Sequence, residues 1–228
     1  MRAGAAIAGL SALVVGIAAL ITVPIVLVTV PEEPTGRASA SASASTERDT
    51  IRVAIAGDSL SAGTSGFSGN GLDAGSWMTY AQGGRVRYVG GWAQAGATPE
   101  QIAAAVRPIG RVDVLVVLAG TNAVRTGRSL EEERISYERI VATIAPRVVI
   151  VSSIPPYGPN PGGAIRYNRL LREYSQERGW TWSDSWQWAR NGNGWKTGAS
   201  ADGVHPATFA GYRMLGEELR CRILAAAG

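Results

Sequence analysis

Ser59 stands where a short apolar run ends, in the segment Gly57-Asp58-Ser59-Leu60. The run before it, 51–56, has the composition of a buried strand, and a glycine after a strand permits a sharp turn. We therefore expect the serine hydroxyl at the surface. A free serine hydroxyl is a weak nucleophile and needs a neighbouring base. Taken alone, the segment is equally typical of an ordinary turn.

A candidate base lies near the other end of the chain, in Asp202-Gly203-Val204-His205-Pro206. A carboxylate three residues before an imidazole can fix its tautomer and stabilise the imidazolium that forms when it takes a proton. His205 is the single histidine, so any mechanism that needs imidazole must use it, and a multi-histidine metal site is excluded. By itself the segment is equally typical of a helix-capping turn.

Two further segments contain hydrogen-bond donors that could stabilise an oxyanion. Gly96-Ala97-Thr98 follows the second apolar run, and Gly120-Thr121-Asn122 follows the third. Such donors must point at the position where negative charge develops, and either a backbone N–H or an asparagine amide can serve. Each segment alone is typical of a strand-to-helix turn. Occurring together with the serine and the histidine, they predict a site for nucleophilic catalysis.

The elements that must position these residues alternate between strands and helices. Five apolar runs predict strands, the last of them weakly, at 51–56, 86–89, 112–119, 147–154 and 180–186. Four amphipathic segments predict helices at 98–106, 129–145, 163–178 and 207–226. The alternation predicts an α/β fold, a three-layer α/β/α sandwich with a mostly parallel five-stranded sheet. Ligands of such sheets bind beyond the carboxyl ends of the strands, where all four segments fall.

The four segments together resemble the SGNH/GDSL hydrolase family of esterases and lipases, whose blocks are matched by AGDSL, AGAT, AGTN and DGVHP across residues 51–226. The resemblance implies a flavodoxin-like sheet, with Ser59 as nucleophile and His205 as base beside Asp202. It also implies an oxyanion hole formed by the Ser59 N–H, the Gly96 N–H and the Asn122 side chain. One departure is Ala123, where the family usually has aspartate. The mechanism needs no metal and no organic cofactor.

These observations favour a serine ester hydrolase that cleaves short acyl or lipid esters. An acyltransferase acting on cell-envelope glycans would use the same residues, and an inactive surface-binding module is a third alternative. Trp188 and Trp195 lie in the loop before Asp202, where an exposed indole could stack on a sugar or cover an acyl chain. Ordinary anchoring of the loop is the competing interpretation. Trp180 and Trp182 are expected in the core.

The first 50 residues predict a membrane anchor and a tether. Residues Ala3–Val30 contain no charged side chain and exceed the roughly 20 residues that span a bilayer. We expect 1–30 to be a transmembrane signal-anchor, 31–50 a flexible Ser/Ala-rich linker and 51–228 the hydrolase domain. Arg2 before the span favours a single-pass cell-membrane protein with the domain outside the cytoplasm. Cleavage of a signal, which would secrete the domain, is the alternative.

The charge and cysteine content exclude other classes. The formal net charge is +4, and 21 of the 22 basic residues are arginine because Lys196 is the single lysine. The arginines are scattered with no basic run of five, so we expect an ester substrate on a small molecule, glycan or lipid and no nucleic-acid partner. Cys221 stands alone, which excludes an intrachain disulfide, and we expect it to be buried.

Overall fold

The computed structural model describes residues 49–63 and 72–228, which form an α/β fold around one parallel sheet. The strand order is β2-β1-β3-β4-β5, so the first strand lies inside the sheet between the second and the third. Parallel pairing relates all neighbours. The strands are β1 (Ile51–Gly57), β2 (Val86–Ala93), β3 (Val114–Leu118), β4 (Val148–Ser152) and β5 (Thr181–Ser183).

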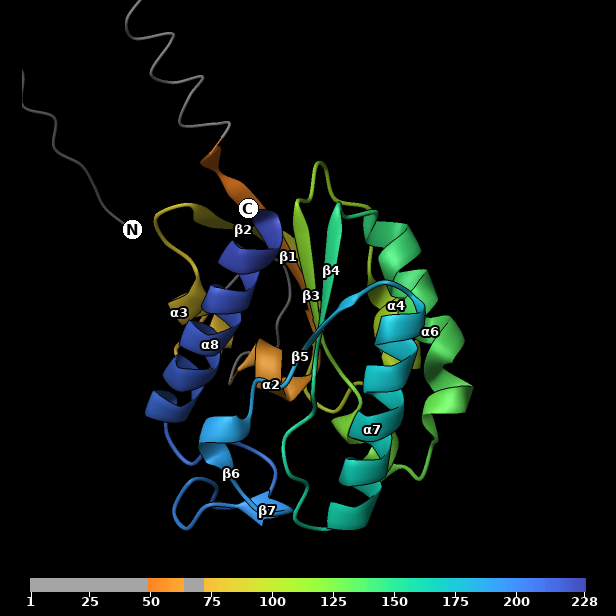
Figure 1. Ribbon diagram of the computed structural model, residues 1–228, viewed down its shortest axis with the longest axis vertical. Coiled ribbons are helices and arrows are strands. Elements are labelled where there is room, and N and C mark those ends of the chain that lie inside the picture. The colour runs from red at the N-terminus through yellow and green to blue at the C-terminus, as the bar shows by residue number, and fades with distance from the viewer. Residues whose placement is uncertain (1–48, 64–71) are drawn as a thin grey trace, which may run out of the picture.

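Helices cover both faces of this sheet and complete three layers (Figure 1). On one face lie α3 (Trp77–Ala81) and α8 (Phe209–Ala227), which pack against each other. On the other lie α4 (Pro99–Ala105), α6 (Leu130–Ile144) and α7 (Pro161–Glu177). Each helix on this second face has an N-cap residue whose side chain accepts a backbone hydrogen bond. Thr98 and Ser129 form capping boxes before α4 and α6, and Asn160 caps α7.

The central strand β3 explains why two separate cores form. All five of its residues are buried, and successive side chains point to opposite faces. Leu115 and Val117 pack with the α4, α6 and α7 side, whereas Val114, Val116 and Leu118 pack with the α3 and α8 side. A strand buried on both faces requires a continuous apolar run, which is the pattern that predicted it.

Short elements at the carboxyl end of the sheet were not predicted. These are α2 (Ser59–Ala62), α5 (Thr121–Arg125), a 3-10 turn η1 (Gln187–Ala189) and the two-stranded ribbon of β6 (Arg190–Asn191) and β7 (Gly194–Trp195). Each spans five residues or fewer, too few for a periodic pattern. β5 is also shorter than expected, because only three residues pair with β4.

Several details of the expected fold differ from the structure. β2 continues to Ala93 rather than stopping at Val89, because Gly91 lets the strand pass directly against the Ile55 carbonyl, where a side chain would not fit. Cys221 is exposed, so its expected burial is wrong. The fully buried indole near β5 is Trp186, whereas Trp180 and Trp182 are partly buried against the core on the α7 side.

The expected membrane anchor at 1–30 and nearly all of the linker at 31–50 lie outside the described residues. Within residues 49–63 and 72–228, no helix combines the length and the apolar character needed to cross a membrane.

Candidate active site

Ser59 lies at the carboxyl end of β1, in the first turn of α2. Asp58 is the N-cap of that turn and its carboxylate accepts a hydrogen bond from the Leu60 N–H. A side chain at Gly57 would collide with the side chain of Ser61 and approach the Leu118 carbonyl, so the strand can only turn here with glycine. As the first residue of α2, Ser59 also has a backbone N–H without an acceptor in its own helix.

Ser59, His205 and Asp202 form a hydrogen-bonded chain. The Ser59 Oγ lies 2.8 Å from His205 Nε2, and His205 Nδ1 lies 2.7 Å from Asp202 Oδ2. With the hydrogen on Nδ1, the imidazole donates to Asp202 and accepts from the serine hydroxyl. Two residues separated by 146 positions in sequence therefore lie at the hydrogen-bonding distance that a nucleophile and its base require.

The Asp202 carboxylate is held as an anion by the loop that contains it. Partial burial raises its pKa, but hydrogen bonds from the His205 side chain and from the His205 and Val204 backbone N–H groups outweigh burial and bring the pKa below its usual value. An ionised carboxylate at Nδ1 favours the imidazolium that forms when His205 accepts a proton.

Contacts from two other loops fix the position of this segment. The Gly203 carbonyl accepts hydrogen bonds from the Gly158 N–H, after β4, and from Trp195 Nε1, on β7. The Gly203 N–H in turn donates to Ser200 Oγ at 2.9 Å. Gly203 has a φ of +75°, a conformation that side chains disfavour. The loop that contains Asp202 and His205 is therefore positioned by tertiary contacts rather than by a helix or strand.

Asp58 is a buried carboxylate next to the nucleophile, and sequence analysis gave it no role. Its side chain has no exposed surface, and burial raises its pKa to about 7 against the lowering effects of the Leu60 N–H, the His205 charge and the Asn122 amide. The Asn122 amide donates to Asp58 Oδ2 at 3.3 Å. The signal for Asp58 in the sequence was its place between the strand-ending glycine and the serine.

Asn122 lies in α5 beside this carboxylate, buried as an oxyanion donor should be. Its amide nitrogen donates to the Ala97 carbonyl at 3.1 Å as well as to Asp58, so both of its hydrogens face protein acceptors. Arg125, three residues later on the same helix face, donates from Nε to Asn122 Oδ1 at 3.0 Å. These contacts fix which way the amide points. The Asn122 amide therefore has no free N–H, although an oxyanion hole was expected to contain one.

Gly96 lies in the turn that Asn122 contacts through Ala97. Its φ is +80°, and the residue is exposed. The turn borders its own hollow of about 280 Å³, which does not include Ser59. The structure thus brings the segment that contains Gly96 against Asn122, while the direct role of the Gly96 N–H in an oxyanion hole stays a prediction.

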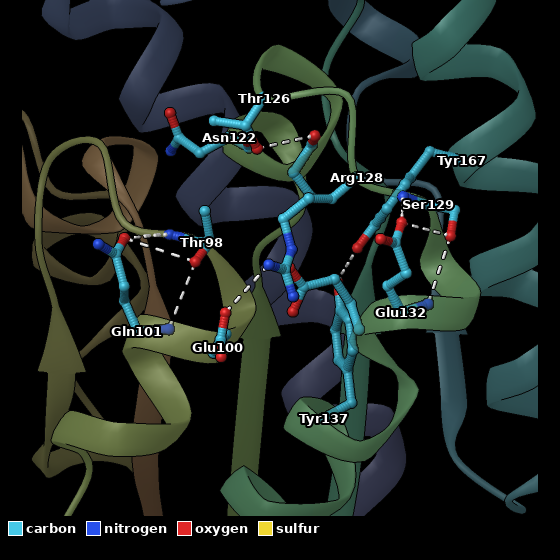
Figure 2. Close-up of polar contacts among 12 residues, drawn as sticks. Thr98, Glu100, Gln101, Asn122, Thr126, Arg128, Ser129, Glu132, Tyr137 and Tyr167 are labelled. Atoms are coloured by element: carbon cyan, nitrogen blue, oxygen red, sulfur yellow. Dashed lines mark hydrogen bonds and ion pairs between the residues drawn. The ribbon is translucent and has the colours of Figure 1, made fainter.

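Arg128 connects the two segments that carry Gly96 and Asn122 (Figure 2). Its guanidinium pairs with Glu100 in the first turn of α4 at 3.1 Å and with Glu133 in α6. Its backbone N–H donates to the Ala123 carbonyl in α5 at 2.9 Å. Glu133 is fully buried. One arginine therefore links α4, α5 and α6, of which α5 contains Asn122 and α4 follows the turn with Gly96.

Two tyrosines pack against the turn between β3 and α5. Tyr137 donates to the Ala119 carbonyl at 2.9 Å and lies 3.2 Å, oxygen to oxygen, from Tyr167 (Figure 2). A side chain at Gly120 would collide with the Tyr167 ring, so glycine is required where β3 turns into α5. Tyr137 and Tyr167 therefore contact the turn that leads into α5, the helix that contains Asn122.

Trp188 and Trp195 are placed by packing on a third indole. Their ring centroids lie 5.9 Å and 5.7 Å from that of the buried Trp186. Neither lines the cavity next to Ser59. Trp195 anchors the loop that contains Asp202 and His205 through its hydrogen bond to the Gly203 carbonyl, and a substrate-binding role for Trp188 and Trp195 stays a prediction.

A cavity of about 450 Å³ opens beside the nucleophile and the base. Among the described residues that line it, the ionisable side chains are those of His205 and Tyr212. The lining residues are Ser59, Gly63, His205, Pro206, Ala207, Thr208, Phe209 and Tyr212. Nothing in the sequence pattern singled out Phe209 or Tyr212, because they belong to the first turns of a helix. Within the described part of the chain, no group of three or more His, Cys, Asp or Glu could hold a metal ion.

Comparisons with known proteins bear on the family and the fold of this chain. The profile of the "GDSL-like Lipase/Acylhydrolase family" matches residues 55–214, which include Ser59 and His205. No match was found among curated proteins.

Solved structures with the same fold include a putative lipolytic protein of the G-D-S-L family from Desulfitobacterium hafniense, at 15% identity and a TM-score of 0.61, covering 76% of this chain and 99% of that one. A lipase/acylhydrolase from Enterococcus faecalis is 16% identical with a TM-score of 0.60, covering 77% and 96%. The acetylxylan esterase Axe2 from Geobacillus stearothermophilus is 16% identical with a TM-score of 0.54, covering 76% and 94%.

Proposed function

Because this chain belongs to the GDSL-like lipase/acylhydrolase family of carboxylic ester hydrolases, we propose that Ser59, His205 and Asp202 hydrolyse esters through an acyl-enzyme. The observation that carries the assignment is the continuous chain of contacts, 2.8 Å from Ser59 Oγ to His205 Nε2 and 2.7 Å from His205 Nδ1 to Asp202 Oδ2. Those distances lie within the range that proton transfer requires.

In the acylation step, Ser59 Oγ attacks the ester carbonyl carbon while its proton passes to His205 Nε2. The carbonyl oxygen becomes an oxyanion, and Asp202 stabilises the imidazolium. When the tetrahedral intermediate collapses, the C–O bond to the alcohol breaks and the Nε2 proton goes to the departing alkoxide oxygen. Water then attacks the acyl-enzyme with His205 as base, and the acid leaves as Ser59 regains its proton.

The oxyanion would accept hydrogen bonds from the Ser59 N–H, from the turn containing Gly96 and from Asn122. For Asn122 this requires one of its two present contacts to be exchanged. The 3.3 Å contact with Asp58 is the longer one and the easier to give up. Catalytic hydrogen bonds commonly tighten only when substrate is bound.

Hydrolysis is favoured over transfer to a glycan hydroxyl by the exposure of the triad. The side chains of Asp202 and His205 are 54% and 35% exposed, so water reaches the acyl-enzyme directly. A transferase would have to exclude water from this position. An inactive binding module would have no need for a complete Ser-His-Asp arrangement.

The full-length chain, purified in mild detergent, should hydrolyse p-nitrophenyl acetate or butyrate. The Ser59→Ala and His205→Ala variants should lose at least about 10³-fold in kcat. A fluorophosphonate should label the wild-type chain on Ser59, as mass spectrometry of the labelled peptide would show. Wild-type activity no higher than that of Ser59→Ala would exclude the proposed function. Adding a glycan acceptor and measuring acylated glycan would distinguish a transferase.

We also propose that the hydrolase domain acts outside the cytoplasm. Support comes from the uncharged stretch Ala3–Val30 preceded by Arg2 and followed by a Ser/Ala-rich segment. A tag after Gly228 should be cleaved by protease added to intact cells. Fractionation would separate the two alternatives, since an anchored chain stays in the membrane pellet until detergent is added and a cleaved one appears in the medium.

A further inference from the structure

The cavity beside Ser59 has one largely apolar wall. Phe209 is 54% exposed, one of four large hydrophobic side chains exposed in the described residues. It lies on the first turn of α8 with Tyr212 one turn further on, and Pro206 and Ala207 continue the wall to His205. An exposed aromatic ring at the edge of a catalytic cavity gains stabilisation when a ligand covers it.

The cavity and the oxyanion candidates lie on opposite faces of the sheet. Ala97, whose carbonyl accepts a hydrogen bond from the Asn122 amide, and Ala123, the residue after Asn122, pack with α4, α6 and α7. The helix α8, which carries Phe209, covers the other face (Figure 1). Ser59 and His205 stand between the two. An ester held with its carbonyl oxygen toward Asn122 therefore extends one of its two remaining groups past His205 into the cavity.

The chemistry selects which group this is. His205 Nε2 must deliver its proton to the departing alcohol oxygen, so the alcohol side of the ester has to lie next to the imidazole. Apart from Ser59 and Gly63, the cavity is lined by His205 and by residues that follow it in the chain. Resting on the proposed function, we infer that this cavity binds the alcohol part of the substrate and selects alcohols with an apolar group, either an aryl ring or an alkyl chain of four or more carbons.

The size of the cavity fits such a group. Its volume of about 450 Å³ is roughly three times that of an engineered cavity of about 150 Å³ that holds benzene. Each methylene that moves from water into such a site increases kcat/KM by up to about fourfold, the equivalent of about 0.8 kcal/mol. A short alcohol such as ethanol would leave most of the wall exposed.

Two substrate series test the inference with the full-length chain. In the first the acyl group is acetyl and the alcohol lengthens from ethyl through butyl to hexyl and benzyl. These alcohols have similar leaving-group chemistry. In the second the alcohol is ethyl and the acyl chain lengthens from acetyl to hexanoyl. We expect kcat/KM to rise at least tenfold from ethyl to hexyl acetate, and to change less than threefold along the acyl series.

Variants connect the selectivity to the wall. Phe209→Ala should lower the ratio of kcat/KM for hexyl acetate to that for ethyl acetate about tenfold. Ala207→Trp, which fills the cavity from an exposed position, should lower the same ratio without removing apolar surface. Met214→Ala is the matched control, because Met214 is a similarly exposed residue of α8 (45%) that does not line the cavity, and it should leave the ratio unchanged.

The inference would be overturned if kcat/KM did not change along the alcohol series, or if it rose along the acyl series instead. It would also be overturned if neither Phe209→Ala nor Ala207→Trp changed the ratio of kcat/KM for hexyl acetate to that for ethyl acetate. These outcomes leave ethyl acetate hydrolysis by Ser59 in place. Failure of the proposed function looks different, because wild type would then hydrolyse none of the esters faster than Ser59→Ala.

Discussion

Replacing Arg128 with methionine is predicted to destabilise the domain and to slow catalysis at the same time. The substitution removes the guanidinium that joins Glu100 of α4 to Glu133 of α6, while the backbone hydrogen bond from residue 128 to the Ala123 carbonyl remains. The methionine keeps the apolar part of the side chain, so the change isolates the charge.

Most of the expected loss comes from Glu133. Its side chain has no exposed surface, and leaving such a carboxylate without its cation costs about 3–5 kcal/mol. The Glu100 pair is 63% exposed on the carboxylate side and contributes about 0–1 kcal/mol. The sum is about 3–6 kcal/mol. For a domain of this size it corresponds to a fall in Tm of about 6–24 °C.

Urea denaturation of wild type and variant measures the loss directly. Arg169→Met is the control, since it breaks an exposed pair with Glu173 and should cost less than about 1 kcal/mol. Adding Glu133→Gln to Arg128→Met should recover at least half of the loss, because the neutral amide removes the uncompensated buried charge. Below the Tm, kcat for butyrate esters should fall about tenfold with KM unchanged, because α5 carries Asn122 and the turn with Gly96 leads into α4.

The reasoning is refuted if Arg128→Met costs no more than Arg169→Met, or if Glu133→Gln fails to recover stability in the double variant. A rise in KM with kcat unchanged would show that Arg128 acts on substrate binding and does not position the oxyanion site.

Four other variants test individual contacts of the site. Asn122→Ala should lower kcat about 10²-fold if its amide reaches the oxyanion, and an unchanged kcat would remove it from the mechanism. Asp202→Asn should lower kcat/KM about 10²-fold, measured at the wild-type pH optimum, since the imidazole loses its anionic partner. Asp58 should make stability depend on pH: its pKa is raised from 3.8 to about 7, so its contribution is full below about pH 4 and lost as pH rises through 7. Over that range, urea denaturation should show the free energy of unfolding of wild type falling by up to about 4 kcal/mol more than that of Asp58→Asn. The same pH dependence in both proteins would contradict this expectation. Trp195→Phe should cost about 1 kcal/mol and a few-fold in kcat through the lost bond to the Gly203 carbonyl, and unchanged thermal and kinetic parameters would show that Gly158 holds the loop alone.

The layered architecture was predictable because its signals are local. β3 is buried on both faces and therefore shows an unbroken apolar run, and Thr98 and Ser129 cap α4 and α6 through contacts with residues three positions later. The misplaced boundaries have a different origin. β2 extends past Gly90 and Gly91 because the Ile55 carbonyl lies against it, a contact that no local pattern contains.

The residue types needed for ester hydrolysis are evident in the amino-acid order alone. A serine after a strand, one histidine and an aspartate three residues before it leave few chemical alternatives, and the order of the four segments indicated the family. What the amino-acid order could not decide is distance and orientation. The 2.8 Å contact between Ser59 and His205 spans 146 residues and depends on the Gly203 loop being held by Gly158 and Trp195.

Tertiary structure alone decided three further points. It placed the Asn122 amide on Asp58 and Ala97 rather than leaving it free, turned Trp188 and Trp195 onto Trp186, and set an apolar wall beside His205. All three result from packing between elements distant in sequence. Local composition determines which elements form and which side chains they offer, whereas the free-energy minimum of the packed chain determines which of those side chains meet.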